Sequence, residues 1–319
     1  MRFELFFKTG AELRLLLRNT RSLDITVNKF NLPNKIKHER KDLLKSASII
    51  QNEYGKSGET IDVCIHYSMK NNKGKTVEES LAMFTSFVDQ VSSLSFSSES
   101  SSENPVREIL LCSGGGKEKT KPDSVEILKS LSTAVIPSNI SLAVVFNPYE
   151  INTENEQRRL KEKLFYNVNR IYLQFGSDLN KLIEGMDFIV ELNKERLLRG
   201  DVPLNVAGSV MLPSKQLLAR FRFRPWAGLV LSGEFLNNID FADKTVRNII
   251  RIYRKYNVEP IIETAVTNKN LEYFKDLFCE FECIKDSLLA ATNKRERERD
   301  TTEEDCDELS SLKRARGNV

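Results

Sequence analysis

The feature of this sequence that most constrains its fold is a regular alternation of short apolar segments with longer segments of helical periodicity. Short runs rich in β-branched and aromatic residues favour strands, whereas apolar residues spaced three and four apart favour amphipathic helices. The expected strands are residues 2–7, 23–28, 61–67, 107–112, 140–146, 170–175, 203–211 and 258–264. The expected helices are residues 11–18, 38–52, 77–88, 122–131, 154–168, 179–199, 214–221 and 243–256.

This alternation predicts an α/β fold with a parallel sheet, because parallel neighbours need a long crossover connection. Eight strand–helix units within about 270 residues fit a closed (β/α)₈ TIM barrel. The competing fold is a doubly wound open sheet. Its nucleotide-binding form carries Gly-x-Gly-x-x-Gly after the first strand, and that motif is missing here. Residues 227–232 also resemble a strand, and we interpret them as part of an elaborated crossover.

Two segments depart from the alternating pattern. Residues 92–104 are mostly Ser, which predicts a flexible loop. Residues 285–319 carry eight basic and nine acidic side chains, which predicts a disordered charged tail after a barrel domain of residues 1–284. Basic clusters at 294–295 and 313–316 have two interpretations, a split nuclear-import signal or a merely solvated tail. The five scattered cysteines are typical of reduced thiols, so we expect a cytoplasmic protein, with a nuclear one as the alternative.

The composition argues against several functional classes. The chain has 319 residues and a formal net charge of +3, which argues against nucleic-acid binding driven by bulk electrostatics. The sequence has no run of about 18 apolar residues, so no membrane span is expected. Residues 1–8 also lack the pattern of a secretory signal. The only histidines are His38 and His66, which excludes a zinc site with three His ligands, and no metal is expected.

In a (β/α)₈ barrel the active site lies where strands end and the following loops begin. The polar residues expected there are Glu4, Asn28, His66, residues 113–116, Asn147, Gln174 and Thr264. Glu4 lies inside an apolar strand, where partial loss of hydration suits a general acid. It could equally be a buried glutamate paired with a lysine. The amide of Gln174 offers both a donor and an acceptor to a heterocycle, while His66 alone is typical of a core histidine.

Two further features lie after the fourth and fifth expected strands. The glycine run 114–116 lets the backbone approach a ligand closely. It is not a phosphate loop, since Lys117 is followed by Glu118 rather than Ser or Thr. Glu156 and Lys163 are seven residues apart and fall on one side of a helix. Spacing alone predicts that both charges face solvent.

Several short segments, taken in chain order, carry a resemblance to a known family. Residues 3–7, Phe-Glu-Leu-Phe-Phe, are similar to an opening Phe-Glu-Phe-Phe-Pro-Pro. Residues 65–68 resemble a strand Pro-His-Leu-Thr, and residues 169–175 resemble Asn-Arg-Ala-Ile-Thr-Gln-Phe. Residues 267–269 resemble a closing Leu-Asn-Arg. The family with these segments is methylenetetrahydrofolate reductase, a flavin-dependent (β/α)₈ enzyme of one-carbon metabolism.

The resemblance implies a set of roles for individual residues. Glu4 would donate a proton to the acceptor and Gln174 would bind it, as the catalytic pair. The residues implied at a bound FAD are Thr26, His66, Gly114, Gly115, Phe146, Glu156, Lys163 and Lys269. NAD(P)H would be the reductant, and a folate-like or other small molecule would accept the electrons.

The sequence also departs from the family. Ser113-Gly114-Gly115 stands where the family has Arg-Gly-Asp, and Lys8-Thr9 replaces the Pro-Pro. Residues 213–215 offer no aromatic to stack on a folate or nicotinamide ring. Two hypotheses follow: a flavin-dependent oxidoreductase, or a catalytically degenerate barrel that acts as a binding or regulatory subunit. Assembly into a homo- or hetero-oligomer stays open.

Overall fold

The structure is a computed structural model, and it describes most of the first 279 residues. The described residues are 1–21, 27–34, 40–55, 61–72, 74–94, 107–114, 122–131, 136–226, 228–264, 270, 272–277 and 279. The chain divides into two units, Met1–Leu271 and Glu272–Val319. In the second unit residues 272–277 and 279 are helical. The domain boundary expected after residue 284 and the charged tail lie outside the described residues.

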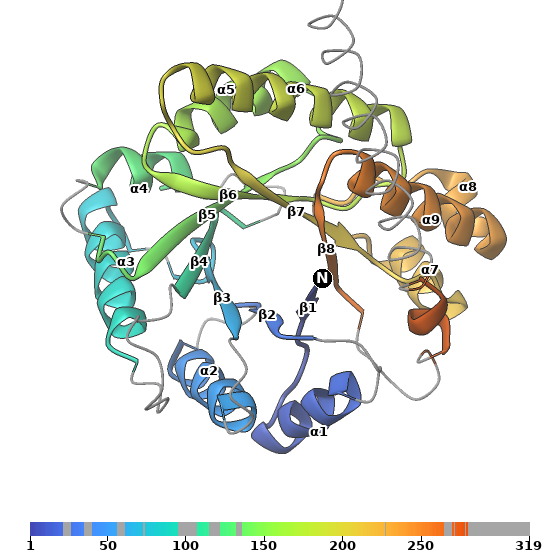
Figure 1. Cartoon of the computed structure of the whole chain (residues 1–319), viewed down its shortest axis with the longest axis horizontal. Helices are drawn as coiled ribbons and strands as arrows, with labels where there is room; N and C mark the ends of the chain where they lie inside the picture. The colour runs from blue at the N-terminus through green and yellow to red at the C-terminus, as the bar shows by residue number, and fades with distance from the viewer. Residues whose placement is uncertain are drawn as a thin grey trace, which may run out of the picture. The chain divides into compact units, whose positions relative to one another are not determined.

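The first unit is a closed barrel of eight parallel strands, which confirms the predicted fold. The strands are β1 (Arg2–Glu4), β2 (Lys29–Leu32), β3 (Asp62–Ser68), β4 (Arg107–Cys112), β5 (Ile140–Phe146), β6 (Val168–Leu173), β7 (Asn205–Val210) and β8 (Glu259–Ile262). They follow one another around the barrel in sequence order, and β1 pairs with β8 to close it. Figure 1 looks down this ring of strands.

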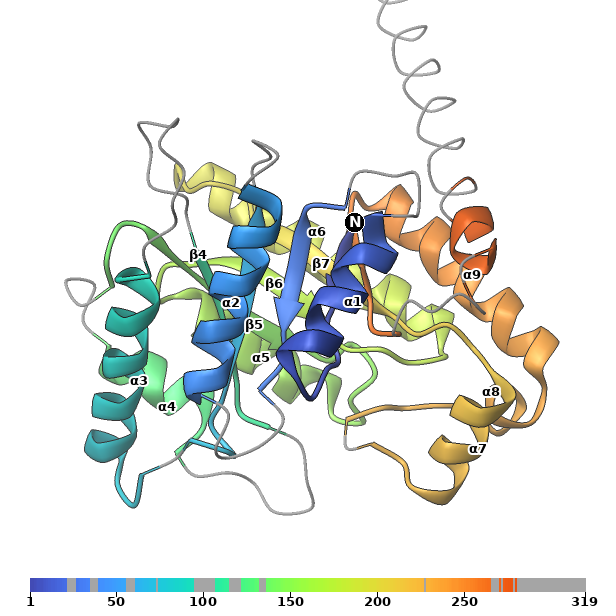
Figure 2. The ribbon, with the colours of Figure 1, turned by 90° about the horizontal axis from the view of Figure 1, so that it is seen from below.

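Helices surround the strands on the outside (Figure 1). They are α1 (Gly10–Arg21), α2 (Arg40–Gly55), α3 (Val77–Ser92), α4 (Ser124–Ser130), α5 (Thr153–Leu164), α6 (Leu179–Leu198), α7 (Lys215–Phe223), α8 (Gly233–Asn237) and α9 (Ile239–Lys255). In the side view of Figure 2, α1, α2 and α3 run alongside the strands. The short helix α8 is an addition to the simple strand–helix repeat.

Polar side chains fix where several of these helices begin. The Thr76 side chain accepts a hydrogen bond from the Glu79 amide at the start of α3. At the start of α4, Asp123 and Glu126 form a capping box, in which each side chain bonds the other's backbone N–H. Asn238 caps α9 in the same general way. Caps of this kind satisfy amides that the first helical turn leaves without partners.

The second strand lies later in the chain than its sequence predicts. Residues 23–28 were expected to form it, but β2 runs from Lys29 to Leu32, and Val27 and Asn28 precede it. Tertiary pairing decides this register: Phe30 pairs with Phe3 of β1 and with Val63 of β3. Its ring is fully buried. Local β propensity is weaker than such packing.

Smaller differences concern segments between elements. The Ser-rich loop does not begin at residue 92, since α3 continues to Ser92; residues 95–106 lie outside the described residues. The segment 227–232 forms no regular strand in its described part, only an isolated parallel bridge between Val230 and Gly176. That bridge attaches the α7–α8 connection to the chain just after β6.

The lumen of the barrel is polar at the end where the strands begin. Arg2 of β1 forms ion pairs with Asp62 and Glu259, at 2.6 and 3.8 Å. Arg170 of β6 forms ion pairs with Glu108 and Glu259, at 2.8 and 2.7 Å. Above these charges lies an apolar layer made of Cys64, Leu110, Ala143, Tyr172, Ala207 and Ile261. Successive side chains of a strand point to opposite faces, so alternate residues enter the lumen.

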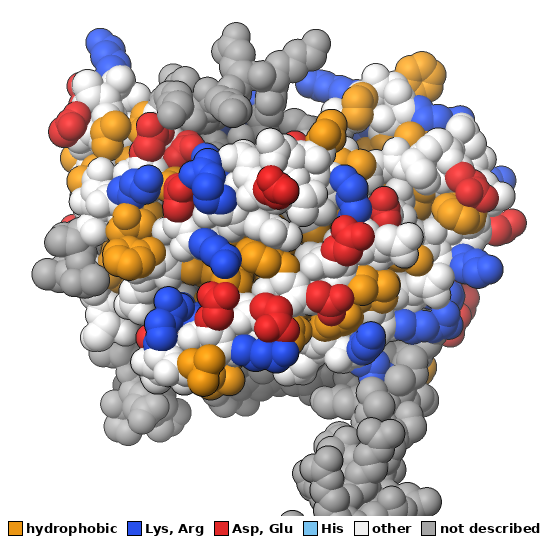
Figure 3. Space-filling model, turned by 90° about the horizontal axis from the view of Figure 1, so that it is seen from above, with side chains coloured by type: hydrophobic (Ala, Val, Ile, Leu, Met, Phe, Trp, Pro, Cys, Tyr) orange, Lys and Arg blue, Asp and Glu red, His pale blue; other side chains and the backbone are white. Residues whose placement is uncertain are grey.

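The outer surface shows charges of both signs. Figure 3 shows one face of the molecule, on which Lys and Arg alternate with Asp and Glu among separate apolar groups. Within the described residues no helix is long and apolar enough to cross a membrane.

Candidate functional site

A cavity of about 400 Å³ opens where the strands end, above the apolar layer of the lumen. A volume in this range suits a small ligand. Its polar lining residues are Glu4, Asn31, His66, Cys112, Ser113, Ser124, Asn147, Glu150, Glu156, Arg159, Lys163, Tyr172, Gln174, Ser209 and Glu263. The carboxyl end of the barrel is also where the loops of this fold carry active sites. We call this cavity the mouth.

The mouth brings together most of the described site residues named from the sequence. Its lining includes Glu4, His66, Gly114, Glu156, Lys163 and Gln174. These residues come from β1, β3, α5 and the segments after β4 and β6. Thr26, Gly115 and Lys269 lie outside the described residues. The remaining candidate, Phe146, lies elsewhere.

Phe146 is fully buried and does not line the mouth. Its ring packs against Phe188 of α6, with the ring centroids 6.0 Å apart. The neighbouring Val145 lines the mouth instead. Because strand side chains alternate in direction, a shift of one residue turns a site position into a position that packs against the helices.

Contrary to the expectation from their spacing, Lys163 is buried and Glu156 is half-buried at the mouth. The Lys163 side chain is buried, and its Nζ donates a hydrogen bond of 2.8 Å to the Val145 carbonyl. Glu156 accepts a hydrogen bond from the Asn147 amide at 3.3 Å. Burial lowers the pKa of Lys163, and the nearby carboxylate of Glu156 opposes that change. The pair therefore places one acid and one base on the wall of the mouth.

Cys112 ends β4 and lines the mouth beside these groups. Burial, reinforced by the negative charge of Glu4, raises the pKa of its thiol to about 12, although Lys163 acts in the opposite direction. Its Sγ donates to the Tyr67 carbonyl at 3.6 Å. A thiol with so high a pKa is not a nucleophile near neutral pH, since the thiolate is the reactive form.

Gln174 lies directly after β6, and its backbone N–H extends the pairing with β5 by donating to the Phe146 carbonyl at 2.9 Å. The α7–α8 connection covers this position. Gly228 adopts a positive φ of 89°, and a Cβ there would lie 3.2 Å from Nε2 of Gln174. The Asn147 side chain donates to the Gly228 carbonyl at 3.2 Å. Glycine is favoured at Gly228 by its conformation and by this close approach.

Several residues of the mouth were not among the candidates predicted from the sequence. Asn31 was missed because the second strand was placed too early, although it is fully buried and pairs with Glu4. Glu263 and Ser209 were missed as well, and they hydrogen-bond each other. Strand parity could have identified Glu263, because it lies two residues after the inward-facing Ile261. Arg159 could not be foreseen, since its partner Asp123 is 36 positions away in sequence.

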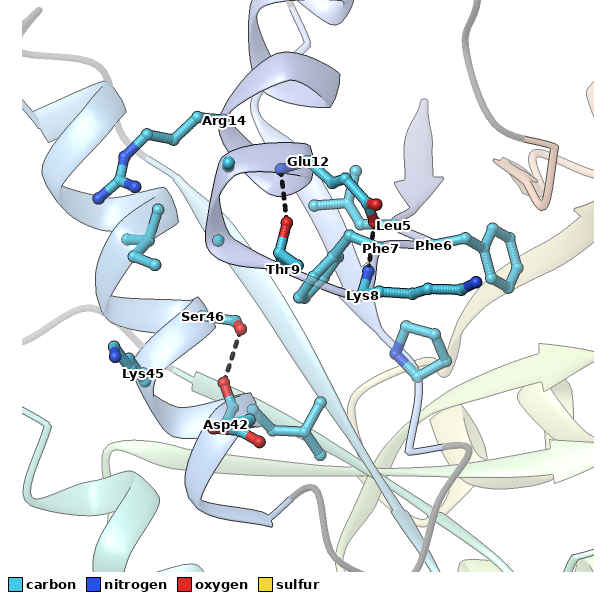
Figure 4. Close-up of a pocket in the computed structure, with 15 residues that line it drawn as sticks. Leu5, Phe6, Phe7, Lys8, Thr9, Glu12, Arg14, Asp42, Lys45 and Ser46 are labelled. Carbon is cyan, nitrogen blue, oxygen red and sulfur yellow. Dashed lines mark hydrogen bonds between the residues drawn. The ribbon is translucent and has the colours of Figure 1, made fainter.

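A second crevice, of about 780 Å³, lies between α1 and α2 and is lined by Phe6, Phe7 and Pro33 among others. Figure 4 shows that its polar groups bond mainly to neighbouring backbone rather than to one common point. The Lys8 amide donates to Glu12 at 2.6 Å, and the Ser46 hydroxyl donates to the Asp42 carbonyl at 2.6 Å. Although larger, this crevice lacks the converging acids and amides of the mouth.

Within the described residues no three His, Cys, Asp or Glu side chains gather as a metal site would require. The mouth offers acids, amides, hydroxyls, one thiol, one imidazole, one guanidinium and one buried amine as its chemical groups. Such a set can hydrogen-bond a polar heterocycle and transfer a proton.

Comparison with known proteins supports the fold. No model of a known protein family matches the sequence, and no curated protein is similar to it. One similar solved structure is described as an uncharacterized protein from Clostridium thermocellum that binds two copies of 5-methyl-5,6,7,8-tetrahydrofolic acid. Its TM-score is 0.54 at 10% sequence identity, over 88% of this chain and 93% of that chain. Altogether 109 solved chains match, and so widely shared a fold does not determine the chemistry.

Proposed function

We propose that the mouth of this barrel binds the pterin ring of a reduced folate. The observation that carries the proposal is the convergence of Glu4, Gln174, Asn31 and His66 on one small cavity above an apolar floor. A pterin is flat and carries hydrogen-bond donors and acceptors around its edge. A carboxylate accepts from adjacent N–H groups, while a side-chain amide both donates and accepts.

The similar structure from Clostridium thermocellum supports this choice of ligand class, because that protein is described as binding 5-methyl-5,6,7,8-tetrahydrofolic acid. The resemblance of short segments to methylenetetrahydrofolate reductase points to the same class from the sequence. Binding without reduction is the outcome expected of a catalytically degenerate barrel.

Flavin-dependent reduction of the folate is the second candidate function. The observation that favours it is the burial of Lys163 and its position with Glu156 on the wall of the mouth. These residues and the backbone at Gly114 fit the polar end of a flavin and would hold it. A bound FAD would supply hydride chemistry, with NAD(P)H as reductant. In that function Glu4 would donate a proton to the folate and Gln174 would orient it.

Calorimetry with 5-methyl-tetrahydrofolate tests the first proposal. We expect saturable binding by the full chain, weakened about tenfold by Glu4→Gln or Gln174→Ala, since each removes one hydrogen-bonding interaction, a charged one for Glu4. Glu184→Gln and Gln90→Ala change exposed residues of α6 and α3 and serve as matched controls. Absence of binding, or equal losses in the control variants, would refute the proposal.

An absorbance spectrum of the purified protein tests the flavin. A flavin spectrum that bleaches on anaerobic addition of NADH or NADPH is the expected result for the second candidate. A colourless protein whose melting temperature does not rise with added FAD would reject it, because a ligand bound to the native state must stabilise that state.

A further inference from the structure

Arg2 is held rigidly inside the barrel. Its side chain is fully buried, and its two terminal nitrogens lie 2.6 and 3.0 Å from the two carboxylate oxygens of Asp62. Such a bidentate pair fixes the plane of the guanidinium group. The remaining nitrogen of the group, Nε, then points at the side chain of Asn31, at 2.8 Å.

The chemistry of the guanidinium group decides how the Asn31 amide is oriented. Arginine has only hydrogen-bond donors, so the Asn31 atom that faces Nε must be the oxygen. The amide nitrogen of Asn31 therefore lies on the other side, 3.0 Å from Nε2 of His66. The reverse orientation would place two donors 2.8 Å apart.

The orientation of Asn31 in turn decides the protonation of His66. An amide NH₂ group only donates, so Nε2 of His66 must offer its lone pair. The ring is then neutral, with its proton on Nδ1, because an imidazolium would carry protons on both nitrogens. Neither nitrogen can accept a proton while this contact lasts.

We propose that Arg2 and Asn31 are positioning residues that hold His66 in the neutral Nδ1–H tautomer, which makes it a hydrogen-bond donor and not a base in the mouth. This inference deepens the proposed function, since it leaves proton transfer to carboxylates such as Glu4. The tautomer itself belongs to the protein without ligand, so it can be measured separately from folate binding.

Nitrogen NMR of the full chain labelled with ¹⁵N-histidine tests the proposal directly. The chain has only two histidines, and the spectrum of His38→Gln assigns the signals of His66. The expected result at neutral pH is an unprotonated Nε2 and a protonated Nδ1. A protonated Nε2 in the wild-type protein would overturn the proposal.

The variant Asn31→Asp tests the part played by Asn31. A carboxylate only accepts, so Nε2 of His66 should gain a proton and its ¹⁵N signal should change to the N–H type. Asn205→Asp, at the exposed start of β7, adds the same charge and should leave the His66 signals unchanged. An unchanged Nε2 signal in folded Asn31→Asp, or the same change in Asn205→Asp, would contradict the proposal. The wild-type spectrum decides the tautomer even if Asn31→Asp does not fold.

Titration with 5-methyl-tetrahydrofolate separates this inference from the proposed function. A wild-type protein with the expected tautomer that binds no folate would refute the function and leave the positioning role intact. Folate binding by a protein whose His66 carries its proton on Nε2 would refute the positioning role and leave the proposed function intact.

Discussion

Glu259 shows how strongly a single residue of the lumen depends on its neighbours. Its carboxylate lies 2.7 Å from Nζ of Lys29, 2.7 Å from Arg170 and 3.8 Å from Arg2. Burial alone would raise its pKa, but the nearby cations, Arg2 and Lys29 foremost, lower it from 4.5 to about 2. The carboxylate is therefore more acidic in the folded protein than in the unfolded chain.

This difference gives a pH-dependent contribution to stability. Because the folded pKa is the lower one, the contribution is complete above about pH 4.5 and disappears as pH falls toward 2. A shift of this size corresponds to about 3 kcal/mol. We expect Glu259→Gln to lower the unfolding free energy by about that amount at pH 7 and to flatten its decline between pH 4.5 and 2. Urea titrations across this pH range measure the unfolding free energy. An equal loss in Glu184→Gln would show that the effect is not specific to Glu259.

The cysteines allow a second prediction about single residues. Burial raises the pKa of the Cys112 thiol to about 12 and raises that of Cys64 as well. Cys279 is exposed. In the folded protein at about pH 8, we expect a maleimide to modify Cys279 while sparing Cys64 and Cys112, because only the thiolate reacts. Peptide mass spectrometry after a timed reaction measures the extent of labelling at each cysteine. Rapid labelling of Cys112 would contradict the raised pKa of its thiol.

The bounds of a strand could be predicted where the local residue pattern determines them, and not where pairing with distant strands does. β4 and β5 have the predicted bounds, Arg107–Cys112 and Ile140–Phe146, since each contains a run of consecutive apolar residues, 109–112 and 142–146. β2 was misplaced because its position depends on pairing with β1 and β3. Phe146 was a site candidate through the family resemblance; its strand was predicted correctly, but the barrel places Val145 rather than Phe146 at the mouth.

The contact between β7 and α9 depends on a glycine. A Cβ on Gly208 would lie 2.3 Å from the ring of Tyr253, which is itself fully buried. We expect Gly208→Ala to destabilise the protein by about 1–3 kcal/mol, as overpacking of a filled core does. Gly233 has open space around the same position, so Gly233→Ala is the matched control. Equal melting temperatures for the two variants would show that Tyr253 moves aside.

At the scale of the whole molecule, the sequence predicted the barrel because eight strand–helix repeats have few other solutions. The site was predicted in part for the same reason: strand ends converge, so Glu4, His66 and Gln174 had to lie near one another. The inward turn of Lys163 could not be foreseen, because its partner is the Val145 carbonyl on a neighbouring strand. Helical spacing alone does not tell which side of a helix faces the strands.

The two ends of the lumen should respond differently to a ligand. We expect saturating 5-methyl-tetrahydrofolate to slow amide hydrogen exchange in residues 110–114, 172–177 and 228–232, which border the mouth. Residues 199–206, at the opposite end, should exchange at unchanged rates, since local openings are largely independent across a structure. Hydrogen-exchange mass spectrometry measures both regions. Slower exchange confined to residues 199–206 would place the ligand elsewhere.

The closure of the barrel between β1 and β8 also has a consequence for biosynthesis. Arg2 pairs with Ile261 and Phe3 with Ile262, partners that are 259 positions apart (261 − 2). A ribosome adding about 5–20 residues per second needs on the order of ten to fifty seconds to make the second partner after the first. Until then the nascent chain has unpaired strand edges that invite aggregation. Arg2 and Asn31 are synthesised early. They acquire the enclosed surroundings that orient His66 only when β1 pairs with β8 and closes the barrel.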